Sequence, residues 1–209
     1  MINTGKIWYS PPRVYGYIEE LKKKDGIKHE QIYEKPEYQK VREALAASVA
    51  GLVMFKFTKM PAFVQLYKNE PPDAYVMMAE AGHFNDQIEI PDTEIGQSHI
   101  TPLEITSYLT DLEGSLLDQL KKKKIPPGAK VLDPHQVLLV HVGIGLTVDI
   151  EPLREHLNAT NTPFPVWLIQ EKQLHPDTIV TVTIVNPQPE IIEVNIGEAS
   201  YQYDQLKLP

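Results

Sequence analysis

The chain has 209 residues, of which 42% are hydrophobic and none is cysteine, and its formal net charge is -8. This composition is typical of a single globular domain rather than of a disordered chain. The absence of cysteine excludes disulfide bonds and a cysteine nucleophile, and the net charge argues against nonspecific binding of nucleic acid by a uniformly basic surface. Because the N-terminus lacks the pattern of a signal peptide and the longest apolar run spans only residues 44–55, we expect a cytoplasmic protein that does not cross a membrane.

Two helices are expected in the first 60 residues. The first covers residues 15–24 and ends at Asp25-Gly26, since glycine favours the end of a helix. The second covers residues 36–57 and begins with Pro36, which suits a first helical turn. Its apolar residues recur at helical spacing, and its many alanines would allow close packing against a sheet.

Three strands follow, with an acidic segment between the second and the third. Apolar runs bounded by turn-forming residues predict strands at residues 62–67, 74–78 and 100–108. Residues 81–98 are expected to form a long loop or a protruding hairpin. From Asp73 to Glu104 the chain holds seven acidic residues and no basic one. This segment could supply ligands to a metal site, or it could be an acidic surface that faces water.

The second half of the chain alternates between helices and strands. Helices are predicted at residues 112–124 and 151–157, and strands at residues 137–142, 166–169, 178–185 and 191–196. The predicted strand at residues 137–142 is almost entirely apolar, as in a parallel strand that is covered on both faces. The pattern predicts an α/β fold with a mixed central sheet flanked by helices. We expect a single domain with an N-terminal arm (1–35), a core (36–145) and a C-terminal α/β extension (146–209).

Two acidic residues on neighbouring predicted strands are candidate metal ligands. Asp73 follows a proline at the start of one strand, and Glu104 lies within the next. Carboxylate oxygens are the hard ligands that Mg²⁺ prefers. Strand alternation places Glu104 and Thr106 on the face opposite Leu103 and Ile105. Alternatively, Asp73 only forms a turn after the proline, and Glu104 lies on an exposed strand and needs no partner.

The element order and these acids resemble the core of the PD-(D/E)XK nuclease superfamily, over residues 37–142. Pro72-Asp73 matches the "PD" of the family, and Glu104-Ile105-Thr106 stands where the family has "(D/E)XK". The resemblance implies a restriction-endonuclease-like core. It also implies that Asp73 and Glu104 hold Mg²⁺, with Glu43 from the preceding helix as an auxiliary ligand and Glu37 as the second choice.

The implied activity is Mg²⁺-dependent hydrolysis of phosphodiester bonds, with nucleic acid as the partner. Thr106 replaces the lysine of the family, so its hydroxyl can position a water but supplies no positive charge. A lysine from Lys121 onward, in the run 121–124, is the candidate substitute base; a solvated basic helix end is the alternative. The second hypothesis is a catalytically inactive member of the fold that binds or scaffolds another protein. The acidic charge of residues 71–209 and Thr106 favour it.

Overall fold

The computed structural model describes residues 7–28, 31–32, 35–66, 73–79, 87–89, 99–125, 135–162, 164–173 and 178–205. The strands are β1 (Ile7–Tyr9), β2 (Ala62–Leu66), β3 (Ala74–Met78), β4 (Gln87–Glu89), β5 (His99–Tyr108), β6 (Val137–Val142), β7 (Val166–Gln173), β8 (Ile179–Asn186) and β9 (Glu190–Asn195). The helices are α1 (Pro11–Asp25), the 3-10 helix η1 (Pro36–Tyr38), α3 (Gln39–Thr58), α5 (Leu116–Lys123), α6 (Glu151–Ala159) and α7 (Ile196–Asp204).

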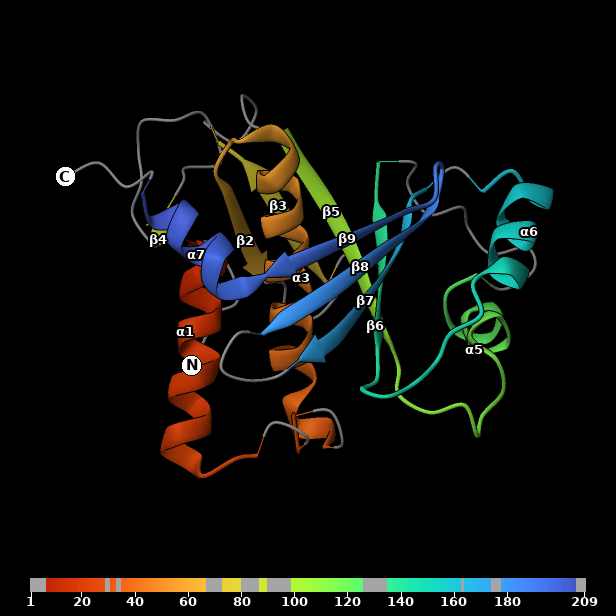
Figure 1. The fold of residues 1–209 in the computed structure, drawn as a ribbon, viewed down its shortest axis with the longest axis horizontal. Coiled ribbons are helices and arrows are strands. Elements are labelled where there is room, and N and C mark those ends of the chain that lie inside the picture. The colour runs from red at the N-terminus through yellow and green to blue at the C-terminus, as the bar shows by residue number, and fades with distance from the viewer. Residues whose placement is uncertain are drawn as a thin grey trace.

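Nine strands among the described residues form one mixed sheet, in the order β4-β1-β2-β3-β5-β6-β7-β8-β9 (Figure 1). The strands β2, β3 and β5 are successive antiparallel neighbours. At the centre, β5, β6 and β7 run parallel, and each parallel connection contains a helix, α5 or α6. The strands β8 and β9 continue the sheet in antiparallel order. The α/β class and the mixed sheet flanked by helices are therefore confirmed.

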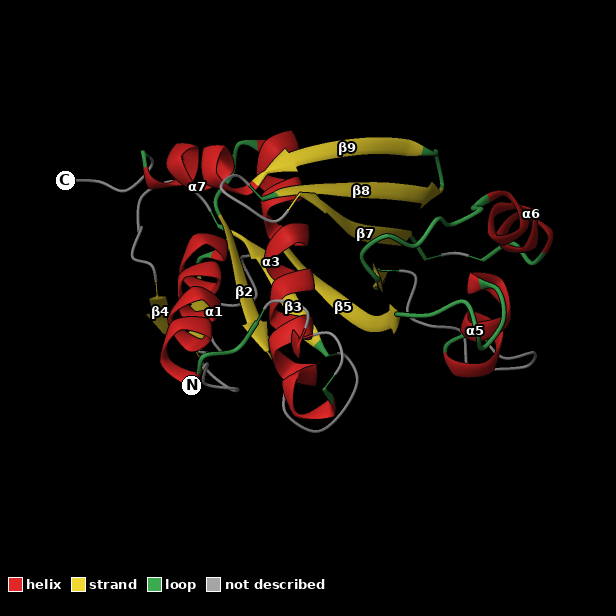
Figure 2. Ribbon diagram, turned by 60° about the horizontal axis from the view of Figure 1, so that its bottom comes forward, coloured by secondary structure: helices red, strands yellow, loops and turns green. Residues whose placement is uncertain are grey.

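Helices cover both faces of the sheet. The helices α1, α3 and α7 lie on one face, and α5 and α6 lie beside the central parallel strands on the other (Figure 2). The central strand β6 separates two apolar clusters: Val137 and Leu139 pack toward α3, whereas Leu138 and Val140 pack toward α5 and α6. All six residues of β6 are buried, as the sequence predicts for a parallel strand covered on both faces.

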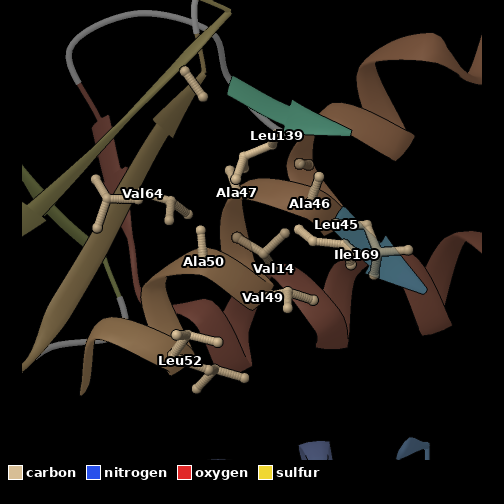
Figure 3. Packing of buried hydrophobic residues seen from close by; sticks show 14 of the residues in the cluster. Val14, Leu45, Ala46, Ala47, Val49, Ala50, Leu52, Val64, Leu139 and Ile169 are labelled. Carbon is tan, nitrogen blue, oxygen red and sulfur yellow. The ribbon is translucent and has the colours of Figure 1, made fainter. Parts of the chain in front are cut away.

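The small residues of α3 let this helix pack closely on the sheet. Ala46, Ala47 and Ala50 are fully buried and lie among larger side chains of the sheet and of α1, as Figure 3 shows. A methyl group added at Gly51 would approach the Cγ atom of Pro11 to 3.0 Å, so α1 begins directly against α3. This packing fixes the position of α3, whose first turns contribute to the candidate site.

Several elements differ from the sequence prediction. The first helix begins at Pro11 rather than residue 15, because the side chain of Ser10 caps it by accepting the N–H of Arg13 at 3.3 Å. The predicted last strand ends one residue early, because Asn195 accepts the N–H of Glu198 at 3.0 Å and starts the unpredicted helix α7. The three-residue strands β1 and β4 were also not predicted.

The predicted helix 112–124 is shorter than expected. It begins only after Ser115, whose hydroxyl accepts the N–H of Asp118 at 3.2 Å, while the Asp118 carboxylate accepts the N–H of Ser115 at 3.2 Å. This reciprocal capping box satisfies two backbone donors at the helix start. Leu112, predicted at the start of the helix, lies in the preceding turn and is 92% exposed.

Some sequence predictions fall outside the described residues. Pro72 is among them, as is most of the acidic segment 81–98, of which the structure describes only the strand β4. Within the described part of the chain, no helix has both the length and the apolar character needed to cross a membrane.

Candidate functional site

Asp73 and Glu104 lie on adjacent strands. Ala74 pairs with Leu103 in the antiparallel ladder of β3 and β5, so extending this register by one residue sets Asp73 opposite Glu104. The Oδ2 atom of Asp73 accepts a hydrogen bond from the main-chain N–H of Ile105 at 2.8 Å. The partly buried Asp73 side chain is thereby held against the segment that contains Glu104.

Glu104 is a buried carboxylate with two polar partners. Its residue is only 4% exposed. Its Oε1 atom forms an ion pair with the Nζ atom of Lys124, and its Oε2 atom accepts a long hydrogen bond of 3.5 Å from the Nε2 atom of Gln136. A charged carboxylate at such a position requires compensation, because burial removes its hydration. Lys124 supplies the compensating charge in this structure.

The helix α5 positions Lys124. Leu116 and Leu120 are buried against the sheet, and Lys124 follows Leu120 by four residues, so all three lie on one side of the helix. The main-chain N–H of Lys124 donates to the carbonyl of Leu120 at 2.8 Å, which fixes the backbone at the helix end. The Lys124 side chain remains 23% exposed.

The N-terminal end of α5 is stabilised electrostatically. Hydrogen bonds from the hydroxyl and the main-chain N–H of Ser115 hold the pKa of the Asp118 carboxyl below its usual value of 3.8, with a smaller contribution from the lysines of the same helix. The ionised carboxylate also lies in the first turn, where the helix dipole favours negative charge. The capping box therefore helps to hold the helix that presents Lys124.

Glu43 projects from α3 toward the same region. It is 4% exposed, and its two carboxylate oxygens accept hydrogen bonds from Gln39 at 2.9 Å and from Lys40 at 2.5 Å. Lys40 and Gln39 lie on the first turn of the same helix, so these partners are local. Glu37, the second choice for an auxiliary acid, lies in the exposed 3-10 helix η1.

A cavity of about 460 Å³ opens where β5 ends. Its walls come from the first turns of α3, the end of β5 with the loop that follows, and α5. The lining residues are Gln39, Arg42, Glu43, Ile105, Thr106, Ser107, Leu109, Thr110, Glu113, Gln119, Lys123 and Lys124. The lining is mostly polar, with three basic and two acidic side chains. Such a cavity suits a polar, negatively charged ligand better than an apolar one.

The cavity unites several of the residues that the sequence singles out. Glu43, Thr106 and Lys124 line it, whereas Glu104 lies buried behind Lys124 and Asp73 is not part of its wall. The alternation predicted for β5 holds: Leu103 and Ile105 pack in the cluster below α3, on the face opposite Glu104. Lys121, the first lysine of the run, does not line the cavity, and Lys124 takes the position next to Glu104.

The donors at Asp73 and Glu104 are compatible with Mg²⁺. They are two carboxylates from adjacent strands, and Mg²⁺ is commonly held by one or two carboxylates while it keeps several waters. Among the described residues, no group of three or more His, Cys, Asp or Glu side chains is arranged to hold a metal ion. Glu43 lines the cavity together with Lys124, but its carboxylate pairs with Gln39 and Lys40 of its own helix, and it does not complete a three-carboxylate cluster with Asp73 and Glu104.

Sequence reasoning missed several residues of this region. Gln119 is one: its Nε2 atom donates to the carbonyls of Thr110 at 2.8 Å and Gly114 at 3.2 Å, which orders the loop at the cavity. Arg42 is another, with its guanidinium donating to the carbonyls of Ile32 and Lys35. Lys124 itself could have been chosen from the run of lysines, because its spacing of four and eight residues from Leu120 and Leu116 marks the buried side of α5.

His141 lies beside this region on β6. It is 1% exposed, and its register partner on β5 is Ser107, which lines the cavity. Farther along the same face, burial raises the pKa of the Tyr15 hydroxyl well above its usual value, and the negative charge of Glu171 raises it further. Tyr15 of α1 and Glu171 of β7 therefore lie close enough for their charges to interact.

Comparisons of the chain with known protein families, with curated proteins and with solved structures find no match.

Proposed function

We propose that the protein is a divergent PD-(D/E)XK-like nuclease that hydrolyses phosphodiester bonds with Mg²⁺. The observation that carries this proposal is the opposition of Asp73 and Glu104 on adjacent strands, with Lys124 beside Glu104 at a polar cavity. The order α3-β2-β3-β5-α5-β6, interrupted by the three-residue strand β4, supports it, because a helix, three strands, a helix and a strand is the order that the sequence resemblance implies.

Each residue of the site has a separate role in the proposed hydrolysis. Asp73 and Glu104 would hold Mg²⁺, and the bound ion would supply a lowered pKa of a coordinated water and a positive charge beside the scissile phosphate. The hydroxyl of Thr106 orients the attacking water. In the reaction the water oxygen bonds to phosphorus, the bond from phosphorus to one ester oxygen breaks, and that oxygen receives a proton. Glu43 lies at the cavity as the auxiliary acid.

Lys124 supplies the positive charge that Thr106 lacks. The ammonium group reaches Glu104 from α5, so a cation stands next to the acidic pair although the strand itself carries threonine. Near a developing phosphate charge, a cation at the edge of a buried site stabilises the transition state far more than a hydroxyl can. The substitute lysine thus comes from the predicted run, at its last position rather than its first.

The alternative function is a catalytically inactive binding or scaffold protein. One observation favours it: the ion pair with Lys124 already compensates the buried charge of Glu104 without a metal. In that case Glu104 and Lys124 hold α5 against the sheet, and the cavity binds a ligand or protein partner without chemistry. The net charge of -8 also fits a partner other than nucleic acid.

A cleavage assay separates the two functions. Labelled single-stranded and double-stranded DNA and RNA are incubated with the protein in Mg²⁺ or Mn²⁺. We expect cleavage that is lost in Glu104→Gln and strongly reduced in Lys124→Met, whereas Lys122→Met retains it because Lys122 is exposed and lies outside the cavity wall. If none of the four substrates is cleaved with either metal, the nuclease function is rejected and the binding function remains.

A further inference from the structure

Lys124 stands between the cavity and the carboxylate of Glu104. The lysine lines the cavity and is 23% exposed, while the Glu104 side chain is 6% exposed and does not contribute to the cavity wall. A cation that enters from the cavity meets Lys124 before it reaches Glu104. The Oε1 atom of Glu104 holds the ammonium group, so the cation competes with Lys124 for the charge of this carboxylate.

Among the polar groups around Glu104 and Asp73, Lys124 is the one that a cation would have to displace. Gln136 approaches Glu104 at 3.5 Å, which is a weak contact. Asp73 uses Oδ2 for the N–H of Ile105, and within the described residues its other oxygen has no hydrogen bond. The charges nearest to a cation are therefore the two carboxylates, which attract it, and the Lys124 ammonium group, which repels it.

The backbone allows Lys124 to change partners without unfolding the helix. The main-chain N–H groups of Lys124 and Ile125 both donate to the carbonyl of Leu120 at 2.8 Å, so the helix end is fixed independently of the side chain. The four-carbon stem of lysine is flexible, and an ammonium group can turn from a carboxylate toward the solvent side. That side is the cavity, where Lys123 and Thr106 also lie.

We propose that Lys124 occupies the position of the divalent cation at Glu104, so that cation binding displaces the ammonium group into the cavity, where it meets the phosphate of the substrate. This inference rests on the proposed function and adds a regulation of the same site. One residue then has two alternating partners: the Glu104 carboxylate when the cation is absent, and an anionic ligand when it is present.

The exchange has a consequence that a structural ion pair does not have. A group that competes with the cation weakens cation binding, so its removal must strengthen that binding. Lys124→Met keeps most of the apolar stem and removes the charge. We expect it to bind Mg²⁺ about fivefold or more tightly than the unchanged protein. Lys124→Arg keeps the charge in a form that pairs in a bidentate manner with carboxylates, so it should bind Mg²⁺ no more tightly than the unchanged protein.

The test is calorimetric titration of the full chain with Mg²⁺ alone, without nucleic acid. The variants are Lys124→Met, Lys124→Arg and, as the matched control, Lys122→Met, which should bind like the unchanged protein. A parallel thermal unfolding series should show a larger rise in Tm with Mg²⁺ for Lys124→Met, because a ligand that binds the folded state more tightly stabilises it more.

The outcomes distinguish this inference from the proposed function. Tighter Mg²⁺ binding by Lys124→Met supports the exchange, even if the protein cleaves no nucleic acid. Equal or weaker binding by Lys124→Met overturns the exchange while the metal site, and with it the nuclease function, stands. Absence of Mg²⁺ binding in every protein overturns both. If Lys124→Met does not fold, tighter binding by Lys124→Arg than by the unchanged protein overturns the exchange, and equal or weaker binding supports it.

Discussion

The carboxylate of Asp73 accepts the main-chain N–H of Ile105 at 2.8 Å, so one side chain joins two adjacent strands at the residue between Glu104 and Thr106. This hydrogen bond gives Asp73 a structural role as well as a proposed role as a ligand. It holds β3 and β5 together at the point where their acidic side chains stand opposite each other. The two roles can be separated, because only one of them requires the charge.

Asparagine and alanine at position 73 should therefore behave differently. Asp73→Asn retains an oxygen that can accept the N–H of Ile105, and we expect its free energy of unfolding to stay close to that of the unchanged protein. Asp73→Ala leaves that N–H without its acceptor and should lower the free energy of unfolding by about 2 kcal/mol, because a buried donor left without a partner loses its hydration without compensation. Urea denaturation measures both. Equal loss of stability in the two variants would assign the effect to the charge instead.

The pair of Glu104 and Lys124 should show strong energetic coupling. Lys124→Met alone leaves a buried carboxylate without its counter-charge, whereas the double variant Glu104→Gln with Lys124→Met leaves no buried charge. We expect the single variant to be less stable than the double variant, with a coupling of roughly 1–3 kcal/mol in a double-mutant cycle.

The control for this cycle is the ion pair of Lys172 and Glu193, in which both side chains are more than half exposed. Solvent screens such a pair, so its coupling should be clearly smaller than that of Glu104 and Lys124. Two equal couplings would mean that Glu104 is hydrated in solution and that Lys124 does not compensate a buried charge.

The capping box of α5 should make the stability of this helix depend on acid pH. The folded-state pKa of Asp118 lies below its usual value of 3.8, because of the hydrogen bonds from Ser115. A lowered folded-state pKa means that the contribution is present above the unfolded-state pKa and is lost as pH falls through the folded-state value. Asp118→Asn should therefore flatten the fall in stability between about pH 5 and pH 2.

Ser115→Ala tests the other half of the cap. We expect a loss of about 1 kcal/mol in the free energy of unfolding at neutral pH, as for other N-cap serines. Denaturation curves at several pH values measure both variants. A Ser115→Ala protein with unchanged stability, or an Asp118→Asn protein with an unchanged acid limb, would contradict the capping geometry.

Tyr15 should limit stability at alkaline pH. Its hydroxyl is buried, and within the described residues it has no hydrogen-bond partner. Burial, and then the charge of Glu171, raise its folded-state pKa well above 10.0, so stability is retained below pH 10 and falls as pH rises further, since only the unfolded chain releases the proton there.

Tyr15→Phe removes the buried hydroxyl and should raise the free energy of unfolding by about 1 kcal/mol at neutral pH, and by more above pH 10. Tyr201→Phe is the control, because Tyr201 is 66% exposed. Thermal unfolding at pH 7 and above pH 10 measures the effect. A destabilised Tyr15→Phe protein would mean that the hydroxyl has a partner in solution.

The sequence predicts the central elements well because their signals are local and strong. The bounds of β6 follow from six residues that are almost all apolar, and the two faces of β5 follow from strand alternation around Glu104. The strands β1 and β4 have three residues each, which is too short for a periodic signal, and they exist only through pairing with each other and with β2. The helix α7 begins at an asparagine, Asn195, which is a common helix-capping residue. The apolar pattern of the preceding strand extends to Ile196, so the strand was predicted to continue through this cap.

The candidate site is less predictable because it combines residues that are distant in the sequence. The choice of Asp73 and Glu104 depends only on two strands being neighbours, which is common for strands that follow one another along the chain, even across the long connection of residues 79–98. The contact of Lys124 with Glu104 depends on the rotation of α5 about its axis, which is set by Leu116 and Leu120 in the core. Gln136, which also reaches Glu104, lies just before β6 and carries no motif that would identify it.

The most direct measurement is a calorimetric titration with Mg²⁺ that compares the unchanged protein with Asp73→Asn and with Asp25→Asn. Asp73→Asn removes one charge from the acidic pair and keeps the hydrogen bond to Ile105, whereas Asp25 is exposed at the end of α1. We predict saturable binding of Mg²⁺ by the unchanged protein and by Asp25→Asn, and its loss in Asp73→Asn. Equal binding by all three proteins, or no binding by any of them, would contradict a metal site at Asp73 and Glu104.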